Sequence, residues 1–234
     1  MPVPQQLTLA IEHPLEQRLD NFVAGNNDEL LQVLRAPVQH FVGLWIYGDI
    51  SSGRSHLLRG RCLRALELGE SACYVSCADY GHNPGGLLAA LEYAAAHGQV
   101  VALDDLQYLP RQQAMHDVVM AIYQRVLNER GVLLVTHSSS SAQVDFLTPD
   151  LTSRMRSLQH YQIVPLDDAA KVRLLKQRAH QRGYALPQPV LDYWLARGPR
   201  SLGALLTDLE TLDKASLVKK SPVTIPLLKQ VLGY

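Results

Sequence analysis

Short apolar runs alternate with longer segments of helical period through the first two thirds of the chain. Four of these runs have the length and near-continuous apolar character of buried strands, at 41–47, 71–76, 100–105 and 132–136, and a last strand is expected at 162–165. Helical segments are expected at 27–34, 55–68, 85–97 and 111–129. Buried strands that alternate with helices are typical of a parallel sheet covered on both faces. The pattern therefore predicts an α/β core.

Beyond Pro165 the hydrophobic period is helical throughout. Four helices are expected, near 168–182, 188–197, 200–217 and 224–232, with glycine or proline between them. This part of the chain is predicted to be a small helical domain. The predicted organisation is a flexible peptide at 1–12, an α/β core at 13–165 and a helical domain at 166–234.

Charge and composition argue against a nucleic-acid-binding surface but do not identify a function. The chain has 22 basic and 22 acidic residues, so no overall electrostatic attraction to nucleic acid is indicated. From Pro165 onward there are 11 basic and 6 acidic residues, which is more typical of a solvated helical surface than of a DNA-reading face. A weak phosphate contact by Lys219 and Lys220 stays open.

The compartment follows from what the sequence lacks. No run of about 18 uncharged apolar residues occurs, and the first residues lack the basic and apolar regions of an export signal. The three cysteines, Cys62, Cys73 and Cys77, have no spacing that indicates a disulfide framework or a zinc site. We therefore expect a cytoplasmic protein without a membrane partner.

The segment 48–55 connects the first predicted strand to a helix and has the pattern of a phosphate-binding loop. Its glycines, Gly48 and Gly53, allow the backbone to fold around phosphate oxygens, and the amides of the following helix attract negative charge. The residues predicted to bind phosphate are Gly48, Ser51, Ser52, Gly53, Arg54, Ser55 and His56. The alternative is a Gly/Ser turn that merely opens a helix. Arg54 stands where lysine is usual, which favours phosphate binding over turnover.

Two carboxylates follow the third predicted strand. Asp104 lies where a carboxylate can hold the water shell of Mg²⁺ while the Ser55 hydroxyl coordinates the ion directly. An aspartate that only caps the next turn is the alternative. Asp105 occupies the place where hydrolytic proteins of this architecture usually have glutamate, and its shorter side chain predicts weak intrinsic ATP hydrolysis.

Together these motifs resemble those of the AAA+ ATPases of the DnaA group. The resemblance covers nearly the whole chain and is carried by Phe22–Asn27, Gly53–Leu58, Pro149–Arg154, Leu212–Ser216 and Thr224–Pro226. Within the group the chain is most similar to the DnaA-related regulator that inactivates the replication initiator. The resemblance implies a P-loop AAA+ core with a parallel five-stranded sheet, followed by an all-helical lid.

The resemblance also implies roles for single residues. The segment that contains Phe22 and Val23 matches the one that lies against the adenine base, although Phe22 alone could equally be a hydrophobic staple. Arg154 matches an arginine finger that reaches a neighbour's γ-phosphate, and Arg156 is more readily a surface arginine. Arg200 matches the lid arginine that contacts the bound nucleotide, and its alternative role is the start of a helix.

The loop after the fourth strand departs from the group's pattern. Ser138 stands where the initiators tend to have an acidic or amide sensor, which favours a diphosphate-bound, non-hydrolytic state. His137 is expected to be a polar loop residue. The expected ligands are therefore ADP, or another nucleoside diphosphate, and Mg²⁺.

The N-terminal peptide resembles the clamp-binding peptides of bacterial replication proteins. In those peptides a glutamine forms hydrogen bonds and apolar side chains fill a pocket on the sliding clamp, and the matching residues here are Gln6, Leu7, Leu9 and Ile11. A stray apolar alternation is the alternative. A short peptide of this kind binds with modest affinity, because its few anchors must offset its loss of entropy.

The resemblance implies a regulator of replication initiation that stimulates hydrolysis of DnaA-bound ATP. The expected partners are DnaA, the DNA-loaded sliding clamp and a second copy of the chain. DnaA-type initiators continue into a helix-turn-helix domain, whereas this sequence ends at Tyr234, so sequence-specific DNA binding is not expected. The alternatives are a helicase-loader-type AAA+ ATPase, which would hydrolyse ATP alone, and a small-molecule kinase.

Overall fold

The computed structural model of the chain describes residues 17–219 and 222–233. The predicted clamp contacts of Gln6, Leu7, Leu9 and Ile11, and the predicted phosphate contact of Lys220, lie outside these residues. None of the helices in the described part of the chain is long and apolar enough to cross a membrane.

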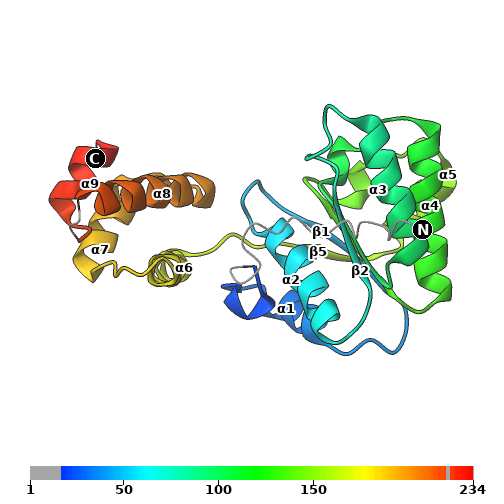
Figure 1. The fold of residues 1–234 in the computed structure, drawn as a ribbon, viewed down its shortest axis with the longest axis horizontal. Helices are drawn as coiled ribbons and strands as arrows, with labels where there is room; N and C mark the ends of the chain where they lie inside the picture. Colours follow the sequence, from blue (N-terminus) through cyan, green and yellow to red (C-terminus); the bar gives the residue numbers. More distant parts are fainter. Residues whose placement is uncertain (1–16, 220–221, 234) are drawn as a thin grey trace, which may run out of the picture. The chain divides into compact units, whose positions relative to one another are not determined.

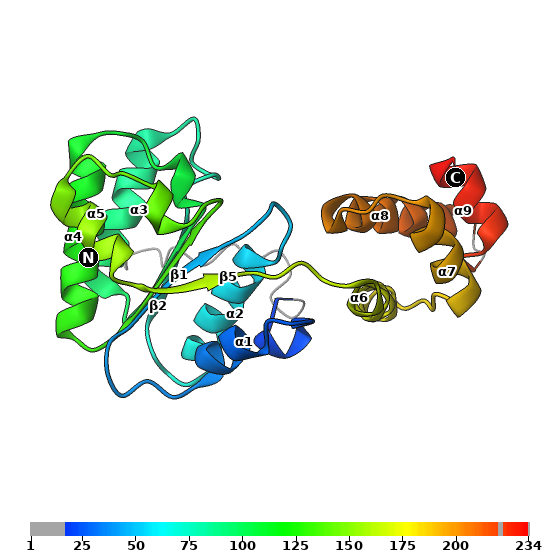
Figure 2. The same cartoon turned by 180° about the vertical axis from the view of Figure 1, so that it is seen from behind.

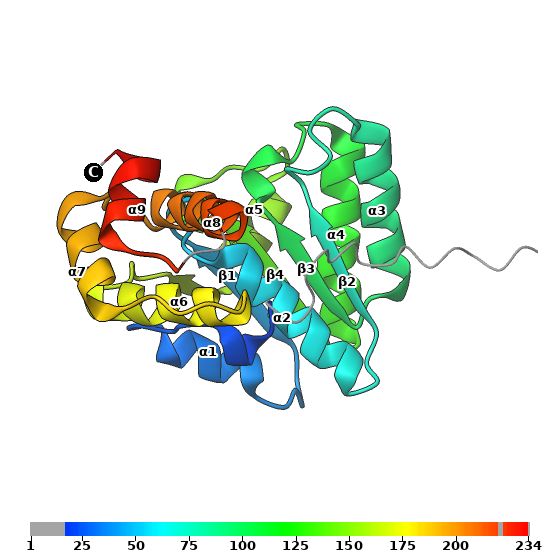
Figure 3. The same cartoon turned by 60° about the vertical axis from the view of Figure 1, so that its left-hand side comes forward.

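Five parallel strands form one sheet, which confirms the predicted fold class. They are β1 (Val42–Tyr47), β2 (Ala72–Ser76), β3 (Val100–Asp104), β4 (Val132–His137) and β5 (Gln159–Gln162). Their order in the sheet is β2-β3-β4-β1-β5, and β1 to β4 can be followed side by side in Figure 3. The carboxyl ends of the strands therefore meet at one edge, which is where ligands bind in open α/β sheets.

Helices cover both faces of this sheet (Figure 1 and, from behind, Figure 2). The α-helices and short 3-10 helices of this part of the chain are η1 (Leu19–Asn21), α1 (Asp28–Arg35), α2 (Arg54–Glu67), α3 (Pro84–His97), η2 (Leu106–Tyr108), α4 (Gln113–Asn128), η3 (Ser141–Gln143) and α5 (Pro149–Arg156). On one face α3, α4 and α5 pack around Trp45, and on the other α2 packs against the central strands. The buried strands β3 and β4 are apolar on both faces, as a doubly covered sheet requires.

The last strand and the helix before it differ from the hydrophobic pattern. The strand expected at 162–165 is instead β5, Gln159–Gln162, so that prediction is wrong by three residues. Three of its four side chains are exposed, because β5 is an edge strand paired only with β1. The helix α5 is not among the elements that the pattern predicts. It begins after Thr148, whose side chain accepts a hydrogen bond from the Leu151 amide, and has Pro149 in its first turn.

The three cysteines are free and buried. Burial raises the pKa of the Cys62 thiol to about 12 and that of the Cys77 thiol to about 12. Burial also raises the pKa of the Cys73 thiol. All three side chains are therefore protonated at neutral pH, and they pack as small apolar groups.

The chain divides into two compact units, of which the second contains the C-terminal helices. The first comprises 17–22, Glu29–Asp49 and Gly53–Ile163, and the second comprises Val23–Asp28, Ile50–Ser52 and 164–233. The helices of the second unit are α6 (Asp168–Gln181), α7 (Gln188–Arg197), α8 (Leu202–Lys219) and α9 (Ile225–Leu232). They enclose a separate apolar core around Trp194. The functional boundaries at 1–12, 13–165 and 166–234 stay a prediction.

We expect Leu191→Ala to destabilise the second unit by about 2–5 kcal/mol, because Leu191 is fully buried in its core and the truncation leaves a cavity. Trp45 and Trp194 lie one in each core, so chemical unfolding followed by fluorescence, with Trp45→Phe as the background, reports the second unit alone. Leu217→Ala is the matched control, since Leu217 is exposed and its truncation costs less than about 0.5 kcal/mol. Equal midpoints for the two variants would contradict this.

Candidate functional site

The segment 48–55 forms the connection between β1 and α2. Two of its residues have left-handed backbone conformations, Ser51 with φ of +64° and Gly53 with φ of +99°. A Cβ atom at Gly53 would lie 2.7 Å from the Phe22 ring, so this position requires glycine for both conformation and space. The segment thus has the tight backbone that its glycine pattern predicts.

The first turn of α2 is open to an anion. Gly53 is the N-cap residue and has no side chain that could accept a hydrogen bond from the first amides of the helix. The side-chain hydroxyl of Ser52 and the Nη1 atom of Arg54 are buried without a hydrogen-bond partner among the described residues. Helix amides next to an unpaired guanidinium arm fit the phosphate groups of a nucleotide.

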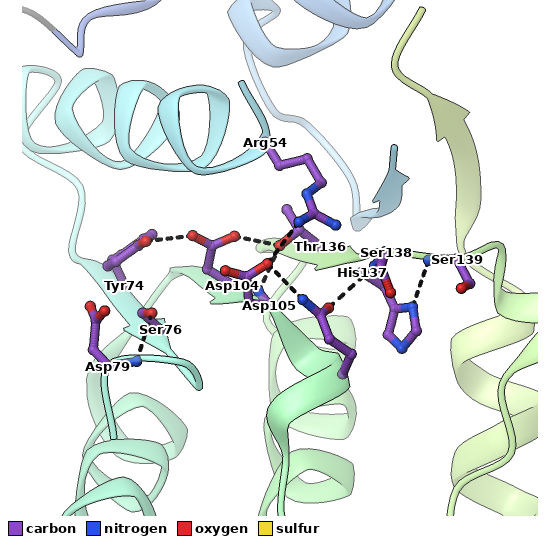
Figure 4. Close-up of polar contacts among 11 residues, drawn as sticks. Arg54, Tyr74, Ser76, Asp79, Asp104, Asp105, Thr136, His137, Ser138 and Ser139 are labelled. Atoms are coloured by element: carbon purple, nitrogen blue, oxygen red, sulfur yellow. Dashed lines mark hydrogen bonds and ion pairs between the residues drawn. The ribbon is translucent and has the colours of Figure 1, made fainter. Parts of the chain in front are cut away.

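The Arg54 guanidinium reaches across the carboxyl edge of the sheet to β3 (Figure 4). Its Nη2 atom donates to Oδ1 of Asp105 at 3.0 Å, and the Arg54 side chain is only 8% exposed. Asp105 itself has a left-handed backbone, with φ of +54°, and its amide donates to the Thr136 hydroxyl at 2.8 Å. The Asp105 carboxylate is therefore paired with a cation.

Asp104 lies in the sheet at the end of β3 and is almost completely buried. The Tyr74 hydroxyl on β2 donates to one of its carboxylate oxygens at 2.5 Å, and the Thr136 hydroxyl on β4 donates to the other. Burial, with Asp104 as the second cause, raises the pKa of Tyr74, so the phenol stays a donor. Both hydroxyls hold the carboxylate at the carboxyl edge of the sheet (Figure 4).

A metal ion at this edge would need ligands in addition to the protein side chains. Among the residues that the structure describes, no group of three or more His, Cys, Asp or Glu side chains could hold a metal ion. A Mg²⁺ site on Ser55 and Asp104 therefore fits only if phosphate oxygens and water complete it.

Phe22 and His56 lie beside Gly53 in the segment 48–55. The Phe22 ring packs on Gly53 and meets the His56 imidazole edge-on, with ring centroids 5.4 Å apart. His56 also shares a hydrogen bond with the Arg18 carbonyl at 2.9 Å, which ties the first turn of α2 to the segment before η1. Phe22 thus contacts the loop directly, in addition to any role as a staple.

The loop after β4 is connected to Asp105 by a glutamine that the sequence did not single out. The Gln107 amide donates to Asp105 Oδ1 at 2.9 Å, and its carbonyl oxygen accepts a hydrogen bond from the Ser138 amide at 3.2 Å. His137 stacks on Trp45 with ring centroids 5.2 Å apart, and its Nδ1 accepts from the Ser139 amide at 2.8 Å. Ser138 therefore contributes its backbone to this network.

We expect the free energy of unfolding to fall as the pH drops below about 6.5, partly because of His137. Burial lowers the pKa of His137 from its ordinary 6.5, so on acidification the unfolded chain gains a proton that the folded chain does not. Chemical unfolding between pH 7.5 and 5.5 measures the slope. His137→Phe keeps the stacking and should flatten the slope, whereas His40→Gln, at an exposed histidine, should not.

Arg154 projects from α5, and Arg156 is tied back to the protein. The Arg154 side chain is 49% exposed and lies 3.4 Å from the Asp150 carboxylate, which is a weak surface pair. Arg156 binds Asp145 at 2.8 Å and donates through Nε to the Ser141 carbonyl at 3.3 Å. Of the two arginines, Arg154 is the one free to reach another molecule.

An open cavity of about 470 Å³ adjoins α5. Its lining residues are Asp145, Phe146, Leu147, Pro149, Thr152, Ser153 and Arg156. The surface beside Arg154 is therefore hollowed and partly apolar.

Arg200 and Val23 belong to the second unit. Arg200 is exposed and pairs with Asp168 at 3.8 Å. Val23 lies in the segment that contains Asn27. The Asn27 side-chain amide donates to the Val164 carbonyl at 3.0 Å, and the Asn27 side-chain carbonyl accepts from the Val164 amide at 2.7 Å. Their predicted contacts with a nucleotide stay predictions, as do those of the other residues of this site.

Comparisons with known proteins agree with this architecture. Residues 168–232 match the family model described as "Hda, lid domain". Domain III of the replication initiation protein DnaA from Thermotoga maritima is 16% identical, with a TM-score of 0.79 over 94% of this chain and 96% of that one. AMPPCP-bound DnaA from Aquifex aeolicus is 19% identical, with a TM-score of 0.68 over 84% of this chain and 65% of that one.

A third similar structure is the Holliday junction branch migration motor RuvB of Thermotoga maritima, with 14% identity and a TM-score of 0.66 over 93% of this chain and 71% of that one. At these identities a structural likeness establishes the fold, and the lid match adds a sequence relationship. The chain thus has the fold of DnaA domain III, and its residues 168–232 match the Hda lid domain.

Proposed function

We propose that this protein regulates replication initiation by stimulating hydrolysis of the ATP that DnaA holds. The match of residues 168–232 to the Hda lid domain carries the proposal. The DnaA-type fold and the exposed Arg154 support it. In this proposal the protein acts in the cytoplasm as a regulator of its partner's site and has little ATPase activity of its own.

The protein acts in its nucleotide-bound form, with ADP as the proposed ligand. DnaA structures of the same fold are described with AMPPCP. The phosphate groups would be held by Gly48, Ser51, Ser52, Gly53, Arg54, Ser55 and His56, with Val23 near the base and Arg200 from the lid. Mg²⁺ would be held by Ser55 and, through water, by Asp104, and would neutralise phosphate charge.

Arg154 supplies the chemistry at the partner's site. A guanidinium placed against the γ-phosphate stabilises the negative charge that develops on its oxygens during hydrolysis. The half-exposed side chain can leave its weak pair with Asp150 at little cost. Asp105 is held by Arg54 in the protein's own site, and a carboxylate so paired is a poor base toward water. The two features together fit a protein that stimulates hydrolysis at its partner's site and does not hydrolyse its own nucleotide.

The sliding clamp and a second copy of the chain complete the proposal. The peptide with Gln6, Leu7, Leu9 and Ile11 would bind the clamp on DNA. Two peptides of a homodimer on one clamp would gain avidity, because the second binding event is intramolecular. Gln6→Ala should then remove co-elution with the clamp, and co-elution that persists would contradict the tether.

Single-turnover hydrolysis of labelled ATP on DnaA, with the clamp loaded on DNA, tests the function. Addition of this protein with ADP should accelerate the loss of ATP, and omission of the clamp should reduce the acceleration. Equal rates with and without the protein, while ADP and clamp binding are intact, would overturn it. Rapid ATP hydrolysis by the protein alone would instead favour the helicase-loader type of ATPase.

A further inference from the structure

Asp105 and Gln107 connect the phosphate loop to the helix that carries the exposed arginine. We propose that they are positioning residues, which couple phosphate binding at Arg54 to the placement of Arg154 through the loop 138–141. This inference rests on the proposed function, since it takes Arg54 as a phosphate ligand and Arg154 as the group presented to the partner.

The coupling begins at the two arms of the Arg54 guanidinium. The Nη2 arm donates to Asp105 at 3.0 Å, and the Nη1 arm is buried and has no acceptor in the described part of the chain. A phosphate oxygen would satisfy the second arm. Because the guanidinium is planar and rigid, a contact on one arm fixes the direction of the other. Binding of phosphate would therefore set the position of the Asp105 carboxylate.

A change in the position of the Asp105 carboxylate would be transmitted to Gln107, because polar contacts hold Asp105 in place. Its left-handed backbone is unfavourable for a residue with a side chain and is maintained by its surroundings. The surroundings include the bond from its amide to Thr136, the bond that its carbonyl accepts from the Tyr108 amide, and the bonds from Arg54 and Gln107 to its Oδ1 atom, which both donors share. Loss or rotation of the Arg54 contact therefore changes the acceptor available to Gln107.

Gln107 extends the chain of contacts to α5. Its carbonyl oxygen accepts from the Ser138 amide, at the start of the loop that ends in Ser141. The Ser141 carbonyl accepts from Nε of Arg156, which lies two residues after Arg154 in α5. Residues two apart in a helix point in different directions, so Arg156 can hold the loop while Arg154 faces outward. A shift of that loop would therefore be passed to α5 through Arg156.

Hydrogen exchange in residues 149–156, measured with and without ADP, tests the coupling, and calorimetry gives the ADP affinity of the same samples. In the unmodified protein ADP should slow exchange in α5 by about fivefold or more, the lower end of typical coupling. Gln107→Leu should remove this response and leave the Kd for ADP within about twofold, because Gln107 does not contact the phosphate loop.

Gln113→Leu is the matched control. Gln113 also donates to an aspartate, Asp117, at 2.7 Å, but on the exposed first turn of α4 and outside the proposed chain of contacts. In the Gln113→Leu variant, ADP should slow exchange in α5 as it does in the unmodified protein. Gln107→Met, with a long flexible side chain, serves if leucine disturbs folding, and thermal unfolding checks both variants.

Three results would overturn the coupling. An unchanged response of α5 in the Gln107 variant would remove Gln107 from it. Binding of ADP without any response in the unmodified protein would overturn the coupling and leave the nucleotide site standing. Absence of ADP binding by the unmodified protein would overturn both, and calorimetry alone distinguishes that case.

Discussion

Arg154→Ala should lower the protein's stimulation of ATP hydrolysis on DnaA by about 10³-fold, the lower end of the effect of arginines supplied in trans. Alanine removes the guanidinium that would face the developing charge on the γ-phosphate. Arg154 contributes little to folding, because it is half exposed and its contacts are a surface pair and a distant approach to the Tyr123 ring. The variant should therefore keep its thermal stability and its ADP affinity. Single-turnover hydrolysis on DnaA, with clamp loaded on DNA, measures the loss.

Three further variants separate a catalytic arginine from general surface charge. Arg64→Ala removes an exposed arginine from α2 and should leave stimulation within about twofold. Arg154→Lys keeps the charge without the planar fork and should be intermediate. Asp150→Ala frees Arg154 from its weak partner and should not reduce stimulation. If Arg154→Ala and Arg64→Ala stimulate equally, Arg154 has no role at the partner's site.

Arg54→Met should raise the Kd for ADP by about 10- to 100-fold, the value of a charge-assisted hydrogen bond to phosphate. The variant also leaves the Asp105 carboxylate without its cation, and Asp105 is only partly exposed, so we expect some loss of stability. Calorimetric titration with ADP measures the first effect and thermal unfolding the second.

The controls for Arg54 distinguish a phosphate ligand from a structural cation. Arg54→Lys should bind ADP more tightly than the methionine variant, because the ammonium keeps the attraction to phosphate. Arg64→Met removes a cation from the same helix at an exposed position and should leave the Kd unchanged. Unchanged ADP affinity in Arg54→Met would show that the buried Nη1 arm does not face a phosphate.

The hydrophobic pattern of the sequence predicts the strands whose side chains are largely buried. The strands β1 to β4 each lie within one residue of a predicted apolar run, and β3 and β4 are buried along their whole length. β5 could not be placed in the same way, because its sequence, Gln-His-Tyr-Gln, is polar and mostly exposed, whereas the apolar residues Ile163 and Val164 lie just after it. α5 is two turns long, and only its first residues, Thr148 and Pro149, mark it as a helix.

The polar network depends on strand order, which the sequence does not contain. Asp104 could be singled out because it ends an apolar run, but its partners Tyr74 and Thr136 come from the strands on either side of β3. The pairing of Arg54 with Asp105 likewise joins residues 51 positions apart. Gln107 carried no signal, because a single glutamine after a strand is common and its role depends on the Ser138 backbone.

The rate at which an alkylating agent reacts with the buried thiols measures how often the core opens. Thiolates react with alkylating agents and thiols do not, so Cys62 and Cys77, with pKa values raised to about 12 and side chains out of contact with water, are protected twice while the core is closed. Each labelling event therefore requires the sheet and its helices to separate. The rate of alkylation of Cys62 and Cys77, measured by mass on peptides that exclude Cys73, gives the frequency of that separation.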